Sequence, residues 1–116
     1  EKFDAAVAAL KWASESASDE ASVQLARLRL ANLQIQQKAY DDASKTLAKP
    51  FTPAFTGLAL DIQGDLYMAQ NKSQDAVKAY TDAWSKLEVN NEYRRLVQAK
   101  LNALGADPEA TKGASK

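Results

Sequence analysis

The 116-residue chain contains no cysteine and no histidine. The absence of cysteine excludes disulfides and thiolate nucleophiles, and the absence of histidine excludes imidazole bases. Together the two absences remove the usual protein ligands of zinc and haem. A chain without thiols cannot form wrong disulfides, so the composition fits an oxidising compartment such as the periplasm without requiring one. Chance in a small domain explains the same absence equally well.

An excess of charge of one sign and long apolar runs are also missing. Fifteen basic residues balance fifteen acidic residues, so neither nucleic acid nor an anionic membrane surface is expected as the main partner. No stretch approaches the roughly 20 apolar residues that cross a bilayer, and no signal peptide is recognisable. We expect any membrane anchor or export signal to lie outside these residues.

What the chain does contain is typical of a globular protein, with 46% hydrophobic and 26% charged residues. Its length suits one domain with a core and is too short for two. Apolar residues recur at helical spacing, and no alternation is long enough for a strand, so the fold class is all-α. The expected helices span about residues 1–16, 20–37, 41–48, 54–70, 73–87 and 92–104, with Ser18 and Ser73 as expected caps and Gly105 as a stop.

A local duplication indicates the architecture. Two sets of residues share the same internal spacing, namely Leu30-Ala31, Ala43 and Leu47, then Gln63-Gly64, Ala76 and Tyr80. The offset from each residue of the first set to its counterpart is constant, and it is close to the roughly 34-residue period of a tetratricopeptide helix pair. We therefore predict a tetratricopeptide-like helical hairpin array, an α-α superhelix of about two full repeats flanked by half repeats, over residues 1–105. Residues 106–116 are expected to form a flexible tail.

The repeat register also assigns the flanking helices. Residues 2–16 are expected to be the second helix of an earlier pair, with an inward stripe of Ala5, Ala9, Trp12 and Ala13. Trp12 and Trp84 are expected in the core rather than as ligand anchors. The final helix is expected to begin a following pair or to cap the array, with a solvent-facing set of Arg94, Arg95, Lys100 and Asn102.

Such arrays present grooves and rarely carry chemistry, so the chain is expected to be a non-enzymatic protein-protein interaction module without a cofactor or metal. The first helix of each pair lines the concave face. The expected protein-binding strip consists of Leu28, Asn32, Ile35, Gln36, Asp61, Asp65, Met68 and Arg95. Side-chain amides and shallow apolar contacts can hold an extended peptide. The two aspartates argue against a ligand that is held by its C-terminal carboxylate.

Asp61 and Asp65 lie one helical turn apart and fit two interpretations. They could be a paired acid site of the glycosidase kind. The favoured alternative is a solvated face, or a salt bridge to Arg95, because exposed charges commonly contribute nothing measurable. Turnover that is abolished when both aspartates are removed would support the enzymatic interpretation.

For two further pairs of residues, the question is whether they lie on the surface or in the core. Arg27 and Arg29 are expected to face solvent and to pair with acidic side chains. Phe51 and Phe55 lie beside prolines in a connection, where apolar residues have less core to enter. They could belong to the core or form an exposed contact for a partner.

Four segments in this order resemble one family. They are Leu25-Ala-Arg-Leu-Arg-Leu-Ala-Asn-Leu-Gln, Pro53-Ala-Phe-Thr-Gly-Leu, Asp61-Ile-Gln-Gly-Asp-Leu-Tyr-Met-Ala-Gln and Arg95-Leu-Val-Gln-Ala-Lys-Leu-Asn-Ala-Leu-Gly. Together they are similar to the periplasmic domain of the YfgM family, the ancillary subunits of the bacterial SecYEG translocon. The resemblance covers roughly residues 21–105.

The resemblance implies an inner-membrane protein with a short cytoplasmic end, one membrane helix and a repeat domain that faces the periplasm. It implies association with the SecYEG translocon and a PpiD-type chaperone, and help in the handover of secretory polypeptides. This chain departs from the family in carrying no membrane helix. A general tetratricopeptide scaffold for envelope protein complexes is the alternative. Open repeat edges would also allow two copies to pair as a homodimer.

Overall fold

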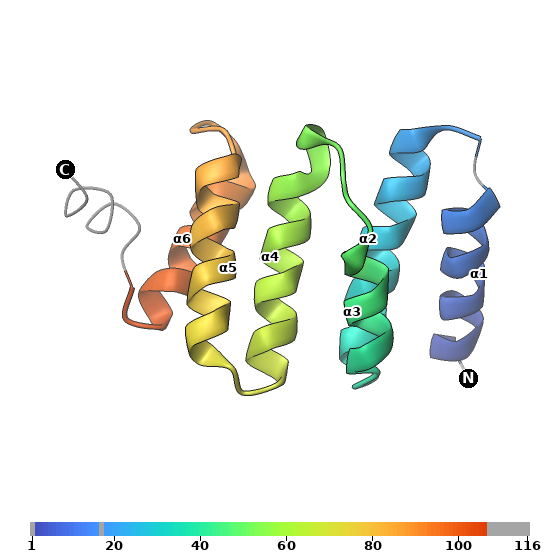
Figure 1. The fold of residues 1–116 in the computed structure, drawn as a ribbon, viewed down its shortest axis with the longest axis horizontal. Helices are drawn as coiled ribbons and strands as arrows, with labels where there is room; N and C mark the ends of the chain where they lie inside the picture. Colours follow the sequence, from blue (N-terminus) through green and yellow to red (C-terminus); the bar gives the residue numbers. More distant parts are fainter. Residues whose placement is uncertain (1, 17, 107–116) are drawn as a thin grey trace. The chain divides into compact units, whose positions relative to one another are not determined.

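The computed structural model describes residues 2–16 and 18–106, and this part of the chain forms helices joined by turns, with no strand (Figure 1). The helices are α1 (Lys2–Ser16), α2 (Glu20–Gln36), α3 (Tyr40–Ala48), α4 (Pro53–Ala69), α5 (Ser73–Lys86) and α6 (Glu92–Ala103). The all-α prediction is confirmed, and the expected helix ends agree to within a single position. The expected tail lies outside the described residues except for Ala106, which packs against apolar residues of the preceding helices.

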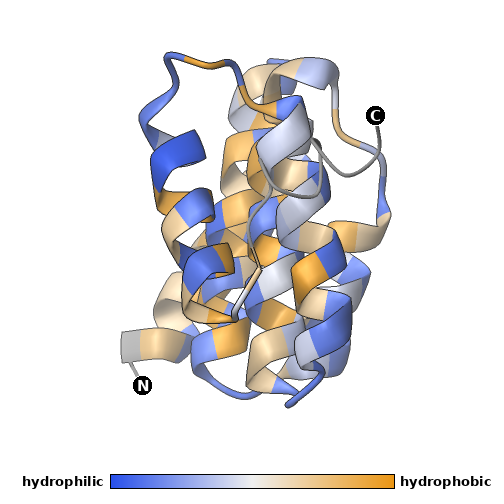
Figure 2. Ribbon diagram, turned by 90° about the vertical axis from the view of Figure 1, so that its left-hand side faces the viewer, coloured by the Kyte–Doolittle hydropathy of each residue, from blue (hydrophilic) through white to orange (hydrophobic). Residues whose placement is uncertain are grey.

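The chain divides into two compact units, residues 1–55 and residues 56–116. In the N-terminal unit α1 packs on α2, and α2 packs on α3. In the C-terminal unit α5 packs on α6, and α4 contacts α5. Hydrophobic and hydrophilic residues alternate along the individual helices, as amphipathic helices require (Figure 2).

The duplication appears in the backbone as the same turn formed twice. Lys38 and Asn71 follow α2 and α4, and both have a left-handed φ of 63°. In the first turn the amide of Ala39 donates to the carbonyl of Gln34, and in the second the amide of Lys72 donates to the carbonyl of Tyr67, both at 2.8 Å. This bond across a left-handed residue is typical of a Schellman end, which satisfies the last carbonyls of a helix. The bond from Lys72 to Tyr67 in the second turn thus corresponds to the bond from Ala39 to Gln34 in the first.

The helix starts differ from two of the expected caps. Asp19, rather than Ser18, caps α2, because its carboxylate accepts hydrogen bonds from the amide and the hydroxyl of Ser22, both at 2.8 Å. A carboxylate at this position also gains from the partial positive charge of the helix start. Ser73 is the first residue of α5 and not its cap, which is Lys72. Gly105 ends α6 with φ 79°, as expected.

Small residues lie where the helices of each pair cross. Ala31 of α2 and Ala43 of α3 are completely buried. In the C-terminal unit, a Cβ atom on Gly64 of α4 would lie only 2.4 Å from Cε1 of Tyr80 of α5. The backbone of α4 therefore approaches the tyrosine ring as closely as glycine permits, which confirms the close crossing inferred from the repeat.

The core of the C-terminal unit confirms the expected position of Trp84. Its buried members come from α5, from the residue that ends α5, and from α6: Ala76, Tyr80, Ala83, Trp84, Leu87, Val97 and Leu101. Arg94 lies over the indole of Trp84, with its Cζ 3.7 Å from the ring centroid, and donates from Nε to the Trp84 carbonyl. Arg94 is therefore not part of a solvent-facing set.

The inward face of α1 was predicted wrongly. Trp12 is 68% exposed, and Ala5 and Ala9 are exposed as well. Of the predicted stripe only Ala13 lies on the less exposed side, together with Ala6, Val7 and Leu10. Alanines occur on both sides of α1, so the larger apolar side chains decide which side turns toward α2.

Candidate functional site

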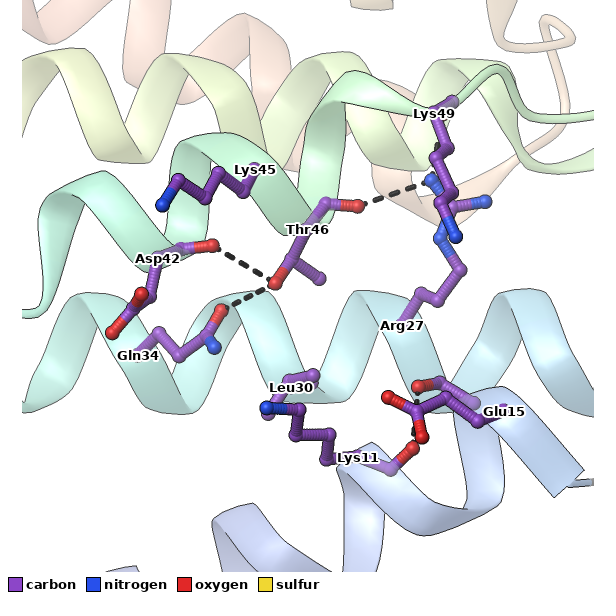
Figure 3. A pocket seen from close by; sticks show the side chains of 10 residues that line it. Lys11, Glu15, Arg27, Leu30, Gln34, Asp42, Lys45, Thr46 and Lys49 are labelled. Atoms are coloured by element: carbon purple, nitrogen blue, oxygen red, sulfur yellow. Dashed lines mark hydrogen bonds between the residues drawn. The ribbon is translucent and has the colours of Figure 1, made fainter.

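A pocket of about 230 Å³ opens in the N-terminal unit among α1, α2 and α3 (Figure 3). Its charged lining contains four basic and two acidic side chains: Lys11, Arg27, Lys45, Lys49, Glu15 and Asp42. The volume is below the roughly 300–1,000 Å³ of typical small-molecule sites. The pocket therefore suits one or two side chains of a partner better than a whole cofactor.

Arg27 anchors one side of this pocket and is only 8% exposed. One guanidinium nitrogen donates to the carbonyls of Thr46 at 3.0 Å and Lys49 at 2.6 Å, and another donates to the carbonyl of Pro50 at 3.3 Å. The guanidinium also lies 3.9 Å from the centroid of the Phe51 ring. The expectation that Arg27 faces solvent is therefore wrong, whereas Arg29 is exposed as expected.

The physical reason is the end of α3. The last carbonyls of a helix have no intrahelical donor, and Pro50 brings no N–H to the connection. A guanidinium supplies several donors in a fixed planar arrangement, so one Arg27 can serve three carbonyls. Burial lowers the pKa of this guanidinium, and the nearby charge of Glu20 opposes the shift. Half-buried Phe51 lies beneath the charge, so its ring is engaged within the unit.

Buried Gln34 of α2 completes the wall of the pocket, whereas buried Gln24 of the same helix is not part of the lining, and the sequence analysis missed both. Gln34 Oε1 lies 2.7 Å from the hydroxyl of Thr46, which is also 2.9 Å from the Asp42 carbonyl. Because a hydroxyl carries one proton, Thr46 donates to one acceptor at a time. Gln24 accepts from the amide of Thr52 at 2.8 Å. The signal for these buried polar residues was the helical spacing of Gln24, Arg27 and Gln34, which places three polar side chains on one face.

A second polar cluster lies in the C-terminal unit, where Lys100 of α6 meets both aspartates of α4. The ammonium is 2.9 Å from Asp61 Oδ1 and 3.1 Å from Asp65 Oδ1, and the hydroxyl of Tyr80 donates to Asp65. The aspartates thus form a bridge, as one of the two interpretations expected. The expected partner Arg95 is wrong, since Arg95 is exposed and Lys100 takes this place.

Two carboxylates surround one ammonium in this cluster. The pKa values of Asp61, Lys100 and Tyr80 are all raised there. Burial raises the pKa of Asp61, and the charge of Asp65 adds to this effect, while the hydrogen bond from Lys100 opposes it. Burial alone would lower the pKa of Lys100, but its hydrogen bond and charge attraction to the aspartates outweigh burial and raise it. The pKa of Tyr80 is raised by burial and by its hydrogen bond to Asp65. Lys100 is therefore a firmly protonated tie between α4 and α6.

The structure separates the residues of the expected binding strip by burial. Leu28 is 4% exposed and Asp61 is 6% exposed, so both lie beneath the surface. The remaining members reach solvent at least in part: Asn32, Ile35 and Gln36 in the N-terminal unit, then Asp65, Met68 and Arg95 in the C-terminal unit. Whether these residues bind a partner stays a prediction.

Metal ligands and membrane-spanning helices were sought in the same part of the chain. Among the described residues, no group of three or more aspartates and glutamates could hold a metal ion. Over residues 2–16 and 18–106, no helix combines the length and the apolar character that a bilayer crossing needs.

The paired helices, the turn that recurs one repeat later and the small residues at the crossings define a helical-repeat protein of the tetratricopeptide class. A family model described as a tetratricopeptide repeat-like domain matches residues 1–106. The chain belongs to this family.

Two curated relatives narrow the comparison. The chain is 38% identical over 104 residues to the "Ancillary SecYEG translocon subunit" of Neisseria gonorrhoeae (strain ATCC 700825 / FA 1090). The aligned residues make up 90% of this chain and 50% of that protein. It is 29% identical over 103 residues to the protein of the same name from Escherichia coli (strain K12). Here the aligned residues make up 89% of this chain and 50% of that protein. The chain thus spans about half the length of the curated relatives it matches. No solved structure matches it significantly.

Proposed function

We propose that this chain is a protein-binding domain of an ancillary SecYEG translocon subunit and that it has no enzymatic activity. The observation that carries the proposal is the 38% identity to a translocon subunit over 90% of the chain. The fold supports it, because helical repeats stack into surfaces that bind other proteins. The acid pair of the enzymatic alternative is engaged by Lys100, so it serves as a tie between helices.

The mechanism is reversible binding of a polypeptide segment or a partner domain. In the N-terminal unit the contacts come from Asn32, Ile35 and Gln36, and in the C-terminal unit from Asp65, Met68 and Arg95. Amide side chains and shallow apolar surface hold an extended chain without fixing its sequence. A subunit that meets many secretory polypeptides benefits from such tolerance.

The domain acts at the bacterial inner membrane and faces the periplasm. Its partners are the SecYEG translocon, a PpiD-type chaperone and secretory polypeptides, with no nucleic acid. The absence of cysteine is compatible with this location, because no thiol can be wrongly oxidised there. A second copy of the chain is a further candidate partner through the open repeat edges.

Affinity purification of the tagged full-length protein from native membranes tests the proposal. The altered protein carries Gln36→Lys and Arg95→Glu, two exposed positions of the strip, and the control carries Lys78→Glu, an exposed charge of α5 outside the strip. Mass spectrometry should find translocon subunits with the wild type and the control, and fewer with the altered strip. Equal recovery of translocon subunits with the altered strip would show that the interface lies outside the strip. No translocon component in any sample would leave a general scaffold for envelope complexes.

A further inference from the structure

The pocket of the N-terminal unit lies on a different face of α2 from the proposed binding strip. Arg27 and Gln34 line the pocket, whereas Asn32 and Ile35 belong to the strip. At roughly 100° per residue, the two sets point roughly 120° apart around the helix. The pocket is therefore a second surface, which the proposed strip does not use.

The pocket collects positive charge in a chain whose overall charge is zero. Lys11 of α1 and Lys45 and Lys49 at the end of α3 are exposed at its edge, and Figure 3 shows Lys11 and Lys45 on opposite sides of α2. Within residues 2–16 and 18–106, none of these three ammonium groups forms an ion pair with an acidic side chain. They are therefore available to an anionic group from outside the chain.

The rest of the lining selects the kind of anion. Arg27 is fixed by three backbone carbonyls and does not have to be ordered when a ligand arrives. Leu30 offers apolar surface to the methylene groups of an incoming side chain. Glu15 and Asp42 repel a ligand with dense negative charge, such as a nucleic acid backbone. These features together fit isolated carboxylates on short aliphatic stems.

We propose that this pocket binds the glutamate and aspartate side chains of an acidic segment in a partner polypeptide. The proposal rests on the proposed function as a protein-binding domain and deepens it by stating the chemistry of one partner. The ammonium groups of Lys11, Lys45 and Lys49 attract the carboxylates, and the volume of about 230 Å³ admits one or two side chains at a time.

The test is an NMR titration of the isotope-labelled full chain. The probe is a short synthetic peptide in which glutamate alternates with serine, and its control replaces each glutamate with glutamine. Backbone amide signals around Lys11, Gln34 and Lys45 should shift with the acidic peptide, and the shifts should weaken as salt is added. The glutamine peptide should leave them unchanged. Equal shifts with both peptides would overturn the proposal.

Charge reversal locates the site. Lys45→Glu with Lys49→Glu should weaken binding of the acidic peptide by about tenfold, since exposed ion pairs each contribute modestly. The matched control is Lys78→Glu with Lys86→Glu, which changes the same charge at exposed positions of α5. Equal weakening in both double variants, or none in the first, would contradict the proposal. Circular dichroism confirms that both variants are folded.

Two further measurements separate the alternatives. In the first, vesicles containing anionic lipid are added in place of the peptide. Shifts with the vesicles but not with the acidic peptide would show that the pocket binds a membrane surface, and would overturn the proposal. The wild-type protein is also purified from native membranes. Recovered translocon subunits without acidic-peptide binding by the wild type would refute this inference alone. Peptide binding without any recovered translocon subunit would refute the proposed function and leave the pocket assignment standing.

Discussion

The close approach of Gly64 to Tyr80 predicts that a single added methyl group destabilises the C-terminal unit. In Gly64→Ala the new Cβ would meet three ring carbons of Tyr80 at 2.4, 2.5 and 2.8 Å. The ring cannot easily move away, because it is buried and its hydroxyl is held by Asp65. Overpacking of this kind costs about 1–3 kcal/mol, while alanine gains about 1 kcal/mol of helix propensity over glycine. The expected net loss is therefore up to about 2 kcal/mol.

A double-mutant cycle shows whether the ring causes this loss. In a Tyr80→Leu background the obstructing ring atoms are gone, so Gly64→Ala should become neutral or should stabilise by about 1 kcal/mol. Urea denaturation followed by the fluorescence of Trp84 measures the free energy of unfolding. The background also carries Trp12→Phe, because Trp12 is exposed and would add a second signal. Stabilisation of the Tyr80 protein by Gly64→Ala, or the same effect in both backgrounds, would refute the packing argument.

Three more predictions concern charge and exposure. Arg27→Met should destabilise the N-terminal unit by about 2–3 kcal/mol in urea denaturation, because three carbonyls at the end of α3 lose their donor. Folding raises the pKa values of Lys100 and Tyr80, so their stabilisation should be complete below about pH 10 and should fall as the pH rises further, in a series of urea denaturations. Trp12→Ser should change the free energy of unfolding by less than about 0.5 kcal/mol, since the side chain lies largely in solvent.

Each of these predictions has a control and a contradicting result. Arg29→Met is the control for Arg27, and equal losses in the two variants would contradict the capping role. Lys100→Met should make the alkaline loss of stability smaller and leave the part that Tyr80 contributes. An unchanged loss would show that other groups cause it. The control for Trp12→Ser is Trp84→Ser, which should be severely destabilising because the ring is buried. A large loss in Trp12→Ser would show that the exposed indole has a structural contact.

The helices and the repeated turn were predictable because they depend on short-range spacing. Small residues at Ala31 and Gly64, at equivalent positions of successive repeats, were enough to place two close crossings. The direction in which α1 faces was not predictable by the same means. Alanine is apolar enough to be buried and small enough to be exposed, so Ala5 and Ala9 gave no preference against Ala6.

The missed contacts depend on tertiary structure. Arg27 is buried because the end of α3 needs donors, and nothing in the local sequence of α2 states that need. In α6, Val97 and Leu101 are completely buried and fix the rotation of the helix. Lys100 then lies roughly 80° from the core direction and Arg95 roughly 140°, so only the lysine can reach the aspartates of α4. The sequence therefore suggested that a basic residue of α6 bridges to the aspartates of α4, but it did not show that this residue is Lys100.

Site-specific photo-crosslinking in native inner membranes tests most directly the claim that this domain binds proteins of the secretory machinery. A photoreactive side chain replaces Gln36 in the proposed strip, Lys45 at the pocket, or Lys78 of α5 as the control, all in the full-length protein. The account predicts crosslinks to a translocon subunit, a chaperone or a secretory polypeptide from the first two positions and far fewer from the third. Equal crosslinking from all three positions, or none from Gln36 and Lys45, would contradict it.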